Sequence, residues 1–436
     1  MSLEVVQTKV PKSRWLRIIP AVILIYMVAA MDRSNISFAV AGGMEKALGL
    51  TATFSGIASG IFFIGYLVLQ VPGGIYAERR SATKYIGWTV AVFGLVAALT
   101  GLAQNFWELL IGRFLLGVVE GGLFPAILVI ITRWFPNEER GRANSLFLLN
   151  SIISGVVGGP IAGWILSISN WHILFVAEGL LSFVLLAIFM PFISNFPAVD
   201  KRLSKAEKDY ILSKLAQDEK ELPTHERKKE SIGSILSRVN TWKMIIIYFC
   251  MQVGIYGYSL WLPSEIKALT NVGIGIIGVL SIFPYIASAV GQYVIAHFSD
   301  RSNNRRLHTA WPLLGLAICL VLSVLTRGEV WISFTFLVAC GAFLHAPSGV
   351  FWTIPPLLSN PDAAASERGI INALGNLGGF LGPFMVGWMT SLFNYYIGFS
   401  VLVVFLLIGF IVTLLLPKRV AGKSEWVTDD SQMATK

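Results

Sequence analysis

Four ionisable side chains interrupt long apolar stretches of this sequence. Asp32 and Arg33 lie in one stretch, and Arg113 and Glu120 lie in another. An ionisable residue at the middle of a membrane helix costs about 2.5 to 3.5 kcal/mol, so such residues are expected to pair or to face a wet cavity. Arg113 and Glu120 are two helical turns apart and therefore share one face. We expect one cavity to hold all four side chains.

Two acids and two arginines in one cavity suit proton-coupled transport of an anion. A guanidinium stays charged and can bind a carboxylate through two parallel hydrogen bonds, so it provides a fixed anion site. A partly buried carboxylate binds protons more readily, and a neighbouring arginine or an arriving anion changes that affinity. The competing interpretation is that two internal ion pairs only hold the helices in register.

Other polar and aromatic residues are weaker candidates for the same pocket. For each of them a hydrogen bond between helices, or ordinary packing, explains the residue equally well. These candidates are Tyr66, Tyr256, His345, Trp352, Asn372 and Asn376. Glu178 is interpreted as an interfacial or helix-end partner. The sequence contains no recognisable set of nucleophile, metal ligands or cofactor motif, so we expect neither an enzyme nor a bound metal or cofactor.

The elements that carry these residues are predicted to be membrane helices. Of the 436 residues, 55% are hydrophobic and 14% are charged, against roughly 25% charged in soluble domains. Lipid requires every backbone polar group to be satisfied within its own span, and the ~10-residue alternation of barrel strands is missing, so the class is all-α. Twelve spans are predicted near 16–40, 52–76, 85–104, 106–131, 143–167, 172–194, 242–264, 272–298, 308–326, 330–356, 367–392 and 394–416.

The distribution of basic residues predicts the orientation. With a cytoplasmic N-terminus, the outside loops hold only Lys46, Lys267 and Arg327 of the 34 basic residues, as expected because cytoplasmic loops retain positive charge. Both termini are then cytoplasmic in a multi-pass protein of a cell membrane, here expected to be a bacterial inner membrane. The positive charge is grouped in short loops, which argues against a nucleic-acid partner. The expected partners are lipid, protons and a small anion, and the protein is expected to be a monomer.

A long polar connection divides the predicted spans six and six. It gives an N-terminal bundle at 1–194, a linker at 195–241, a C-terminal bundle at 242–416 and a cytoplasmic tail at 417–436. Within the linker, Ser204 and Glu207 form a possible capping box. Tyr210, Ile211 and Leu215 could give a short amphipathic helix one apolar side against the bundle or the membrane surface, and we interpret this helix as a solvated cytoplasmic helix rather than as a partner-binding site.

The same short motifs follow equivalent spans in the two sets of six. Gly74, Glu78 and Arg79 follow the second predicted span, and Asp300 and Arg301 follow the eighth. Because six spans separate these equivalent elements, they fall on the same side of the membrane. This is a parallel repeat, which predicts two pseudo-symmetric six-helix bundles that rock about a central site.

At this point the residues resemble the major facilitator superfamily and, within it, the anion:cation symporter family. The superfamily's loop motif is recognisable in Gly74, Glu78, Arg79 and Lys84, with Glu78 replacing the usual aspartate. Asp300 and Arg301 repeat part of this motif in the second half of the chain. The narrower family is similar at several places across the chain. These are Asp32, Arg33, Asn35, Tyr66, Gln70, Arg113, Glu120, Arg133 to Pro136, Phe351 to Thr353, Asn372 and Asn376.

The resemblance implies particular roles for some of these residues. Asp32 and Glu120 match the family's proton-coupling acids, while Arg33, Tyr66 and Arg113 match residues that line its anion site. The loop residues match a gating loop. The implied substrates are sugar acids, tartrate-like dicarboxylates, aromatic acids and small sulfonates, taken up with protons by alternating access.

Two other functions compete with symport. A proton-coupled drug antiporter is suggested by the glycines from Gly155 to Gly163. A similar pattern in the eleventh predicted span indicates that these glycines serve packing, and two arginines in the cavity favour an anionic substrate. A non-transporting membrane receptor could sense anions through the same pocket. Flux measurements separate these possibilities.

Overall fold

The computed structural model describes residues 12–221, 231–358 and 364–417, and every regular element within these ranges is helical. The first elements are α1 (Ser13–Ala39), η1 (Val40–Met44), α2 (Glu45–Leu48), α3 (Ala52–Tyr76), η2 (Ala77–Ser81), α4 (Ala82–Thr100), α5 (Phe106–Glu120), α6 (Leu123–Trp134), α7 (Asn137–Leu148), α8 (Asn150–Ile168), α9 (Trp171–Phe189), η3 (Met190–Phe192), η4 (Pro197–Val199), α10 (Lys205–Glu221) and α11 (Ile232–Leu236). The remaining elements are α12 (Val239–Thr270), α13 (Ile274–Leu280), α14 (Ile282–Ser302), α15 (Arg305–Leu325), α16 (Val330–Leu344), α17 (Ala346–Phe351), α18 (Pro355–Leu358), α19 (Ala364–Asn376), α20 (Gly378–Leu392) and α21 (Tyr395–Leu414). The predicted all-α membrane class is confirmed, whereas the predicted tail lies outside the described residues from 418 onward.

Eleven stretches of the described chain are long and apolar enough to cross a membrane. One of them, Ala52–Thr100, contains 49 residues and would be about 74 Å long as a straight helix, more than twice the ~30 Å hydrocarbon thickness. It bends at Ser81, whose backbone is extended and whose hydroxyl caps α4 by accepting from the Lys84 N–H. This stretch therefore accommodates two of the twelve predicted spans, α3 and α4.

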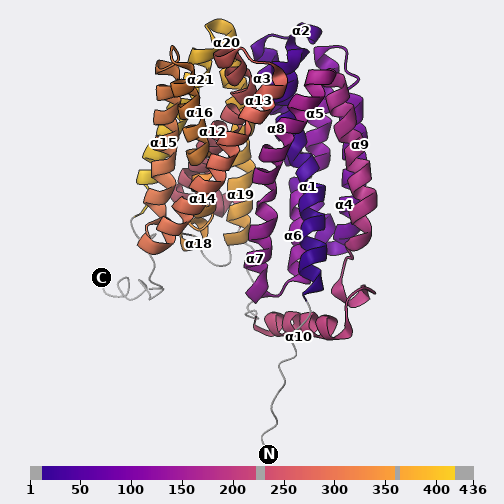
Figure 1. Cartoon of the computed structure of the whole chain (residues 1–436). Helices are drawn as coiled ribbons and strands as arrows, with labels where there is room; N and C mark the ends of the chain where they lie inside the picture. The colour runs from indigo at the N-terminus through magenta and orange to yellow at the C-terminus, as the bar shows by residue number, and fades with distance from the viewer. Residues whose placement is uncertain (1–11, 222–230, 359–363, 418–436) are drawn as a thin grey trace, which may run out of the picture.

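The helices are arranged in two groups that stand side by side (Figure 1). We call α1 to α9 the N-terminal half and α12 to α21 the C-terminal half. Helix α10 lies across the lower end of the N-terminal half in Figure 1, and we call this end of the molecule the α10 end. The residue limits predicted for the two bundles stay a prediction.

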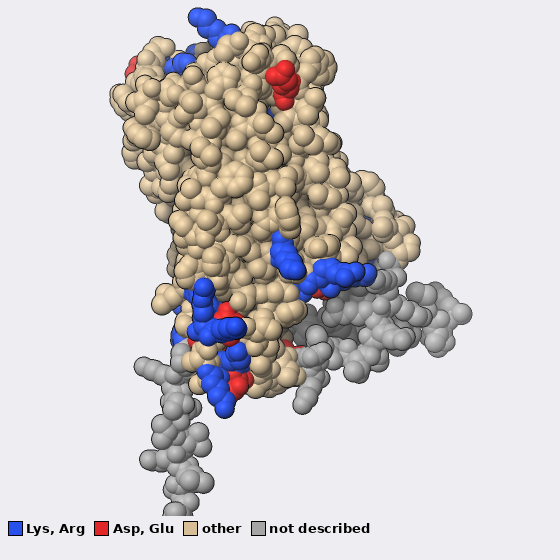
Figure 2. Space-filling view, turned by 90° about the vertical axis from the view of Figure 1, so that its right-hand side faces the viewer, with Lys and Arg blue, Asp and Glu red and all other residues tan. Residues whose placement is uncertain are grey.

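An apolar belt separates the charged ends of the molecule. In Figure 2 the lysine, arginine, aspartate and glutamate side chains on this face gather mainly toward the lower end, with a few at the upper end. Large apolar side chains between the ends face outward, including Trp88 and Tyr293, which are 73% and 74% exposed. Such a surface would be unfavourable in water and is the expected surface toward lipid.

Several predicted spans are broken within the membrane. The span predicted at 106–131 divides into α5 and α6 at Gly121 and Gly122. The span predicted at 330–356 divides at His345, and Pro347 lies in the first turn of the next helix, α17. Proline favours the first turn of a helix but cannot continue one because it lacks the N–H donor. Each of these two stretches is still long and apolar enough to form one span, as predicted. Hydropathy records the length of a span and does not show where its helix breaks.

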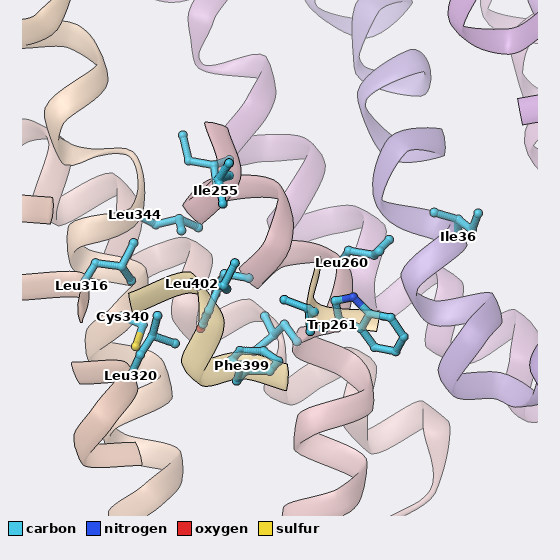
Figure 3. Close-up of a cluster of buried hydrophobic side chains, with 14 of the residues drawn as sticks. Ile36, Ile255, Leu260, Trp261, Leu316, Leu320, Cys340, Leu344, Phe399 and Leu402 are labelled. Carbon is cyan, nitrogen blue, oxygen red and sulfur yellow. The ribbon is translucent and has the colours of Figure 1, made fainter. Parts of the chain in front are cut away.

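The larger buried apolar cluster joins the two halves. Ile36 of α1 belongs to the same buried cluster as residues of α12, α15, α16 and α21 (Figure 3), among them Trp261 and Phe399. Each of these three side chains is no more than 1% exposed. Trp261 also donates an indole hydrogen bond of 3.1 Å to the Pro383 carbonyl. The halves therefore share a packed core.

Close backbone contacts join the halves at the end opposite α10. A Cβ atom on Gly56 of α3 would lie 2.5 Å from the Pro383 carbonyl oxygen of α20, and one on Gly163 of α8 would lie 2.8 Å from that of Ile274. Lys267 Nζ donates a 2.5 Å hydrogen bond to the carbonyl oxygen of Ala41. Glycine permits this close approach of helices, so this end is closed in the structure.

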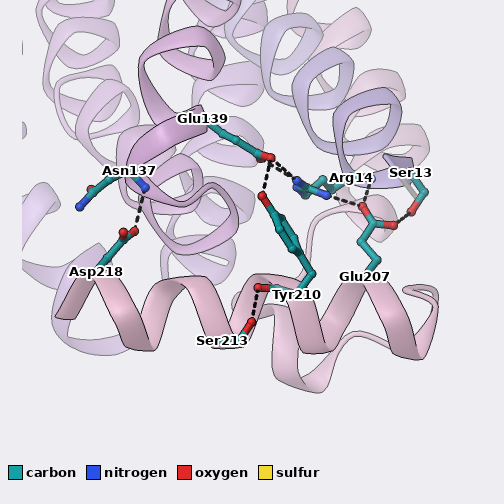
Figure 4. A network of polar contacts seen from close by, with 8 residues as sticks. All are labelled: Ser13, Arg14, Asn137, Glu139, Glu207, Tyr210, Ser213 and Asp218. Atoms are coloured by element: carbon teal, nitrogen blue, oxygen red, sulfur yellow. Dashed lines mark hydrogen bonds and ion pairs between the residues drawn. The ribbon is translucent and has the colours of Figure 1, made fainter. Parts of the chain in front are cut away.

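Helix α10 is attached to the N-terminal half through Arg14 (Figure 4). Arg14 is 1% exposed, and its guanidinium contacts Glu139 at 2.6 Å and Glu207 at 2.9 Å. The Glu207 N–H donates to the Ser204 hydroxyl as the capping box predicts, but the Glu207 carboxylate binds Ser13 and Arg14 instead of its own helix start. The predicted helix forms with its apolar side against the bundle, one of the two surfaces expected for it. Ile211 lies on this side of α10 and is 0% exposed, and Arg14 and Glu139 of the bundle contact the same side.

Candidate functional site

The four charged residues singled out in the sequence form two ion pairs between α1 and α5. Arg113 Nη1 lies 2.6 Å from Asp32 Oδ2, and these side chains are 1% and 0% exposed. Arg33 Nη2 pairs with Glu120 Oε1, and these side chains are 16% and 0% exposed. Each helix thus contributes one acid and one arginine, and the structure brings the four side chains together as ion pairs between the two helices.

Small residues allow α5 to bring these charges close. A Cβ atom on Gly117 would clash with the Phe62 carbonyl oxygen of α3, and a Cβ atom on Gly121 would clash with that of Tyr66. Gly117 lies one turn before Glu120 on α5, and Gly121 directly follows it, so the close α3 contact sets the position of this acid. The sequence interpretation of Gly117 and Gly121 as close-packing residues agrees with this geometry.

Aromatic rings surround the Arg33 guanidinium. Its Cζ atom lies 5.5 Å from the ring centres of Tyr26 and Phe62 and 5.2 Å from that of Tyr66. Arg33 also donates a hydrogen bond of 2.8 Å to the Tyr26 hydroxyl. Ring faces attract a cation without neutralising it, so these rings hold Arg33 in place and leave Glu120 as the group that balances its charge.

Both ion pairs leave hydrogen-bonding capacity unused. Asp32 Oδ1, Glu120 Oε2, and the Nε atoms of Arg33 and Arg113 are buried without a hydrogen-bond partner among the described residues. A guanidinium and a carboxylate can form two parallel hydrogen bonds, but each pair here is joined by one. Buried groups of this kind are usually satisfied, so the unused atoms mark places where a proton or a ligand oxygen would be stabilised.

A cavity of about 100 Å³ lies between the two halves next to these pairs. Its lining from the N-terminal half includes Arg33, Ser59 and Ser154, and its lining from the C-terminal half includes Tyr256 and His345. Of the four paired residues, Arg33 is the one that reaches the lining. The cavity places a cation, hydroxyl groups and an imidazole around one space, as a polar ligand requires.

The predicted pocket residues do not all reach this cavity. Tyr256 and His345 line it, and the Ser288 hydroxyl and His345 Nδ1 are 2.9 Å apart. Trp352 instead packs its ring 4.9 Å from that of Tyr248. Tyr66 contacts Arg33 but is not among the lining residues.

Asn372 and Asn376 lie in a hydrogen-bonded chain rather than in the cavity lining. Gln252 Nε2 donates to Asn376 Oδ1 at 2.8 Å, and Asn376 Nδ2 donates to Asn372 Oδ1 at 3.3 Å. The first bond joins α12 to α19 and the second lies within α19, and amides that satisfy one another in this way need no ligand. The alternative of a helix-to-helix contact, left open by the sequence, describes them better in this state.

The predicted gating residues lie at the α10 end in separate places. Gly74 is near the end of α3, whereas Glu78 and Arg79 are exposed in η2. The Glu78 carbonyl accepts a 2.6 Å hydrogen bond from Arg133. In the C-terminal half, Asp300 pairs with Arg305, and Arg301 lies in the last turn of α14. No hydrogen bond or ion pair joins the Glu78 and Arg79 side chains to the other half within the described chain.

Sequence reasoning missed two residues near the site. Tyr26 lies two helical turns before Arg33 on the same face, a spacing that could have identified it. Glu178 on α9, interpreted from the sequence as an interfacial or helix-end partner, is instead only 4% exposed and close to Asp32. The sequence gives the position of Glu178 along its helix, but it does not show which neighbouring helix the side chain faces.

Comparisons of the sequence and of the structure with known proteins agree with one another. Residues 22–366 match the family model described as Major Facilitator Superfamily. The chain is 32% identical over 413 residues to a quinolone resistance transporter of Acinetobacter baumannii, covering 91% of this chain and 92% of that protein. It is 31% identical over 423 residues to a putative tartrate transporter of Agrobacterium vitis, covering 94% and 95%. The crystal structure of an inward-facing, unoccupied bacterial homologue of the human lysosomal transporter Spinster superposes with a TM-score of 0.76 at 18% identity, covering 93% of this chain and 97% of that one.

Proposed function

This chain belongs to the Major Facilitator Superfamily, and from that premise we propose that it takes up a small organic anion together with one or more protons. It is a multi-pass membrane protein and a secondary transporter, not an enzyme. Within the superfamily we assign it to the anion:cation symporter family. The observation that carries this proposal is the pair of single-contact ion pairs, Arg113 with Asp32 and Arg33 with Glu120, inside the spans.

Protonation of the acids would release the arginines for the anion. A neutral carboxyl no longer attracts a guanidinium, so a proton on Asp32 frees Arg113, and one on Glu120 frees Arg33. A carboxylate ligand then forms the two parallel hydrogen bonds that neither acid forms in the structure. Loss of the protons restores the ion pairs and expels the anion, which links the two fluxes.

Alternating access would proceed between bundles at 1–194 and 242–416, connected by the linker at 195–241. The few basic residues in the outside loops favour cytoplasmic termini and a cytoplasmic α10. The closed end opposite α10 then faces outward, so the structure corresponds to a state closed toward the outside. We place the protein in a bacterial inner membrane as a monomer, with Tyr66, Tyr256 and His345 contacting the anion.

The experiment that tests the proposal is uptake by the purified chain in proteoliposomes across an imposed pH gradient. The panel contains tartrate, a sugar acid, an aromatic acid and a small sulfonate, because the similar chain from Agrobacterium vitis is named a putative tartrate transporter. An inward proton gradient should drive accumulation of at least one anion. Symport is wrong if no anion enters, or if uptake ignores the gradient and is unchanged in Glu120→Gln.

A second candidate function, drug export, is favoured by similarity to the quinolone resistance transporter. In that case an outward substrate flux would be driven by protons moving in. The glycine series from Gly155 to Gly163 gives this candidate little support, because Gly159 and Gly163 pack against the backbone of α13. The same proteoliposomes loaded with a quinolone decide between import and export, and absence of any flux would favour an anion sensor.

A further inference from the structure

Glu178 is a buried acid that the proposed pairing does not use. It lies on α9 with 4% of its surface exposed. Neither of its carboxyl oxygens is held in a hydrogen bond of normal geometry among the described residues. An ionised carboxylate without partners is very unfavourable away from water, so such a group is expected to find a partner or to become neutral.

The neighbours of Glu178 belong to the candidate site. Asn35 of α1 approaches its carboxyl group, and Asp32, Arg113 and Glu120 lie close enough to act on it electrostatically. The Asn35 amide oxygen is also buried without a partner. Glu178 thus adjoins the Asp32 side of the cluster, one helical turn of α1 away through Asn35.

The other helices packed against α9 contribute no further charge at this level. Gly179 lies against Gly94 and Ala98 of α4, and the titratable residues of α4 are Lys84 and Tyr85 in its first turn, near the α10 end. Helix α8 contains no titratable residue. The charged groups facing Glu178 are therefore those of α1 and α5.

The charges of this cluster do not cancel when all of its acids are ionised. Asp32, Glu120 and Glu178 could supply three negative charges, whereas Arg33 and Arg113 supply two positive ones. Both arginines are already paired, with Glu120 and Asp32 respectively. One bound proton makes the cluster neutral, and the acid without an arginine is the place where that proton costs least.

We propose that Glu178 is a third proton-binding residue, which holds a proton while both ion pairs are closed and exchanges it with Asp32 when Arg113 moves to the substrate. This inference rests on the proposed symport function. In the exchange, the O–H bond of the Glu178 carboxyl breaks and one forms on Asp32, so the proton stays within the pair. When a substrate anion takes Arg113, the two acids must together bind one further proton from solution to remain neutral. Glu178 would thereby keep a proton beside Asp32 in a buried position.

The first test is infrared difference spectroscopy of the purified full chain at neutral pH without substrate. A protonated carboxyl absorbs apart from a carboxylate, and we expect Glu178→Gln to remove one such band. Asp32→Asn should remove the same band, because Glu178 then ionises to balance Arg113. Glu178→Asp keeps an acid and should shift the band instead. An unchanged spectrum in Glu178→Gln would overturn the proposal, as would a band that persists in Asp32→Asn.

The second test compares two kinds of flux with labelled tartrate, or with the panel anion that the wild type accumulates most. Counterflow exchanges substrate without net proton movement and should survive in Glu178→Gln, which also shows that the variant folds. Proton-driven uptake should fall by about ten-fold or more, the scale of losing a positioned proton carrier. Equal effects on both fluxes, or none on driven uptake, would contradict the exchange with Asp32.

The matched control is Glu265→Gln on α12. Glu265 is 5% exposed and also has a buried oxygen without a partner, but it lies in the C-terminal half outside the cluster. Its driven uptake should equal that of the wild type. If the wild type accumulates no anion, symport itself fails, while the infrared test still decides whether Glu178 holds a proton.

Discussion

Arg113 Nη1 on α5 lies 2.6 Å from Asp32 Oδ2 on α1, with both side chains buried. This single contact joins the two helices that carry every charge of the proposed anion site. Any anion that binds Arg113 competes with Asp32, because both negative groups are stabilised by the same single positive charge. The competition makes anion binding and protonation of Asp32 one linked event.

The first prediction concerns Arg113→Lys. An ammonium keeps the positive charge but cannot form two parallel hydrogen bonds with a carboxylate, so affinity for the transported anion should fall by about ten-fold or more, equivalent to ~1.4 kcal/mol. Isothermal titration calorimetry on purified protein measures this. Arg305→Lys, at the Asp300 pair of the α10 end, is the control and should bind like the wild type. Unchanged affinity in Arg113→Lys would remove Arg113 from the anion site.

The second prediction concerns coupling through Glu120→Gln. The amide cannot gain or lose a proton, so a proton gradient should no longer drive accumulation, whereas counterflow of the anion should continue. Proteoliposome uptake with and without the gradient measures both. Glu108→Gln is a control on the same helix, because Glu108 is exposed and bonds only near the α5 start. Retained accumulation in Glu120→Gln would place coupling elsewhere.

Much of this site could be predicted from sequence because charge within an apolar run is rare and has few physical solutions. The cost of burying Asp32, Arg33, Arg113 and Glu120 required them to pair, and two of these lie on each helix. Sequence could not assign the partners. Arg113 and Glu120 share a face of α5, yet each pairs across to α1.

The fold was predictable for a similar reason, and its details were not. Lipid requires long helices, so their number and class follow from hydropathy. Pro347 marks the break at His345 in the sequence, but the break at Gly121 depends on packing between helices, and the burial of Glu178 depends on which way α9 is rotated. A single sequence records neither the packing nor the rotation.

The third prediction concerns closure of the end opposite α10. In Gly56→Ala the new Cβ would lie 2.5 Å from the Pro383 carbonyl oxygen, so α3 and α20 must separate at a cost of about 1–3 kcal/mol. A cysteine placed at Ser59, in the cavity lining, should then react faster with a membrane-impermeant maleimide added from outside. Gly141→Ala is the matched control, since nothing lies within 4 Å of its Cβ position. Equal labelling rates in the two variants would argue against this contact as a gate.

The fourth prediction concerns the attachment of α10. Arg14→Met would remove the guanidinium that lies between Glu139 and Glu207 and contacts both. The two carboxylates would then face each other. Breaking a buried pair in this way costs about 3–5 kcal/mol, which should appear as a lower melting temperature of the purified protein in detergent. Glu207→Gln in the same chain should restore part of the loss by removing one of the two charges. A double variant no more stable than Arg14→Met would show that packing, and not charge, governs the attachment.

The fifth prediction concerns pH and Asp200, which lies between η4 and α10 outside the spans. Burial alone would raise the pKa of Asp200, but hydrogen bonds from Ser194 and Arg202 and the charge of Arg17 outweigh it and lower this pKa. Arg17 Nη2 lies 3.0 Å from Asp200 Oδ2. Because the folded pKa is the lower one, Asp200 stabilises the fold above its unfolded pKa of about 3.9. That contribution is lost as the pH falls through the folded pKa.

Asp200→Asn should therefore melt at a lower temperature than the wild type near neutral pH, and the difference should shrink below about pH 4. Thermal unfolding in detergent over a pH series measures it. Asp209→Asn, exposed on α10, is the control and should melt like the wild type throughout. A difference between Asp200→Asn and the wild type that stays constant on acidification would mean that the side chain's shape, rather than its charge, anchors the start of α10 to α1.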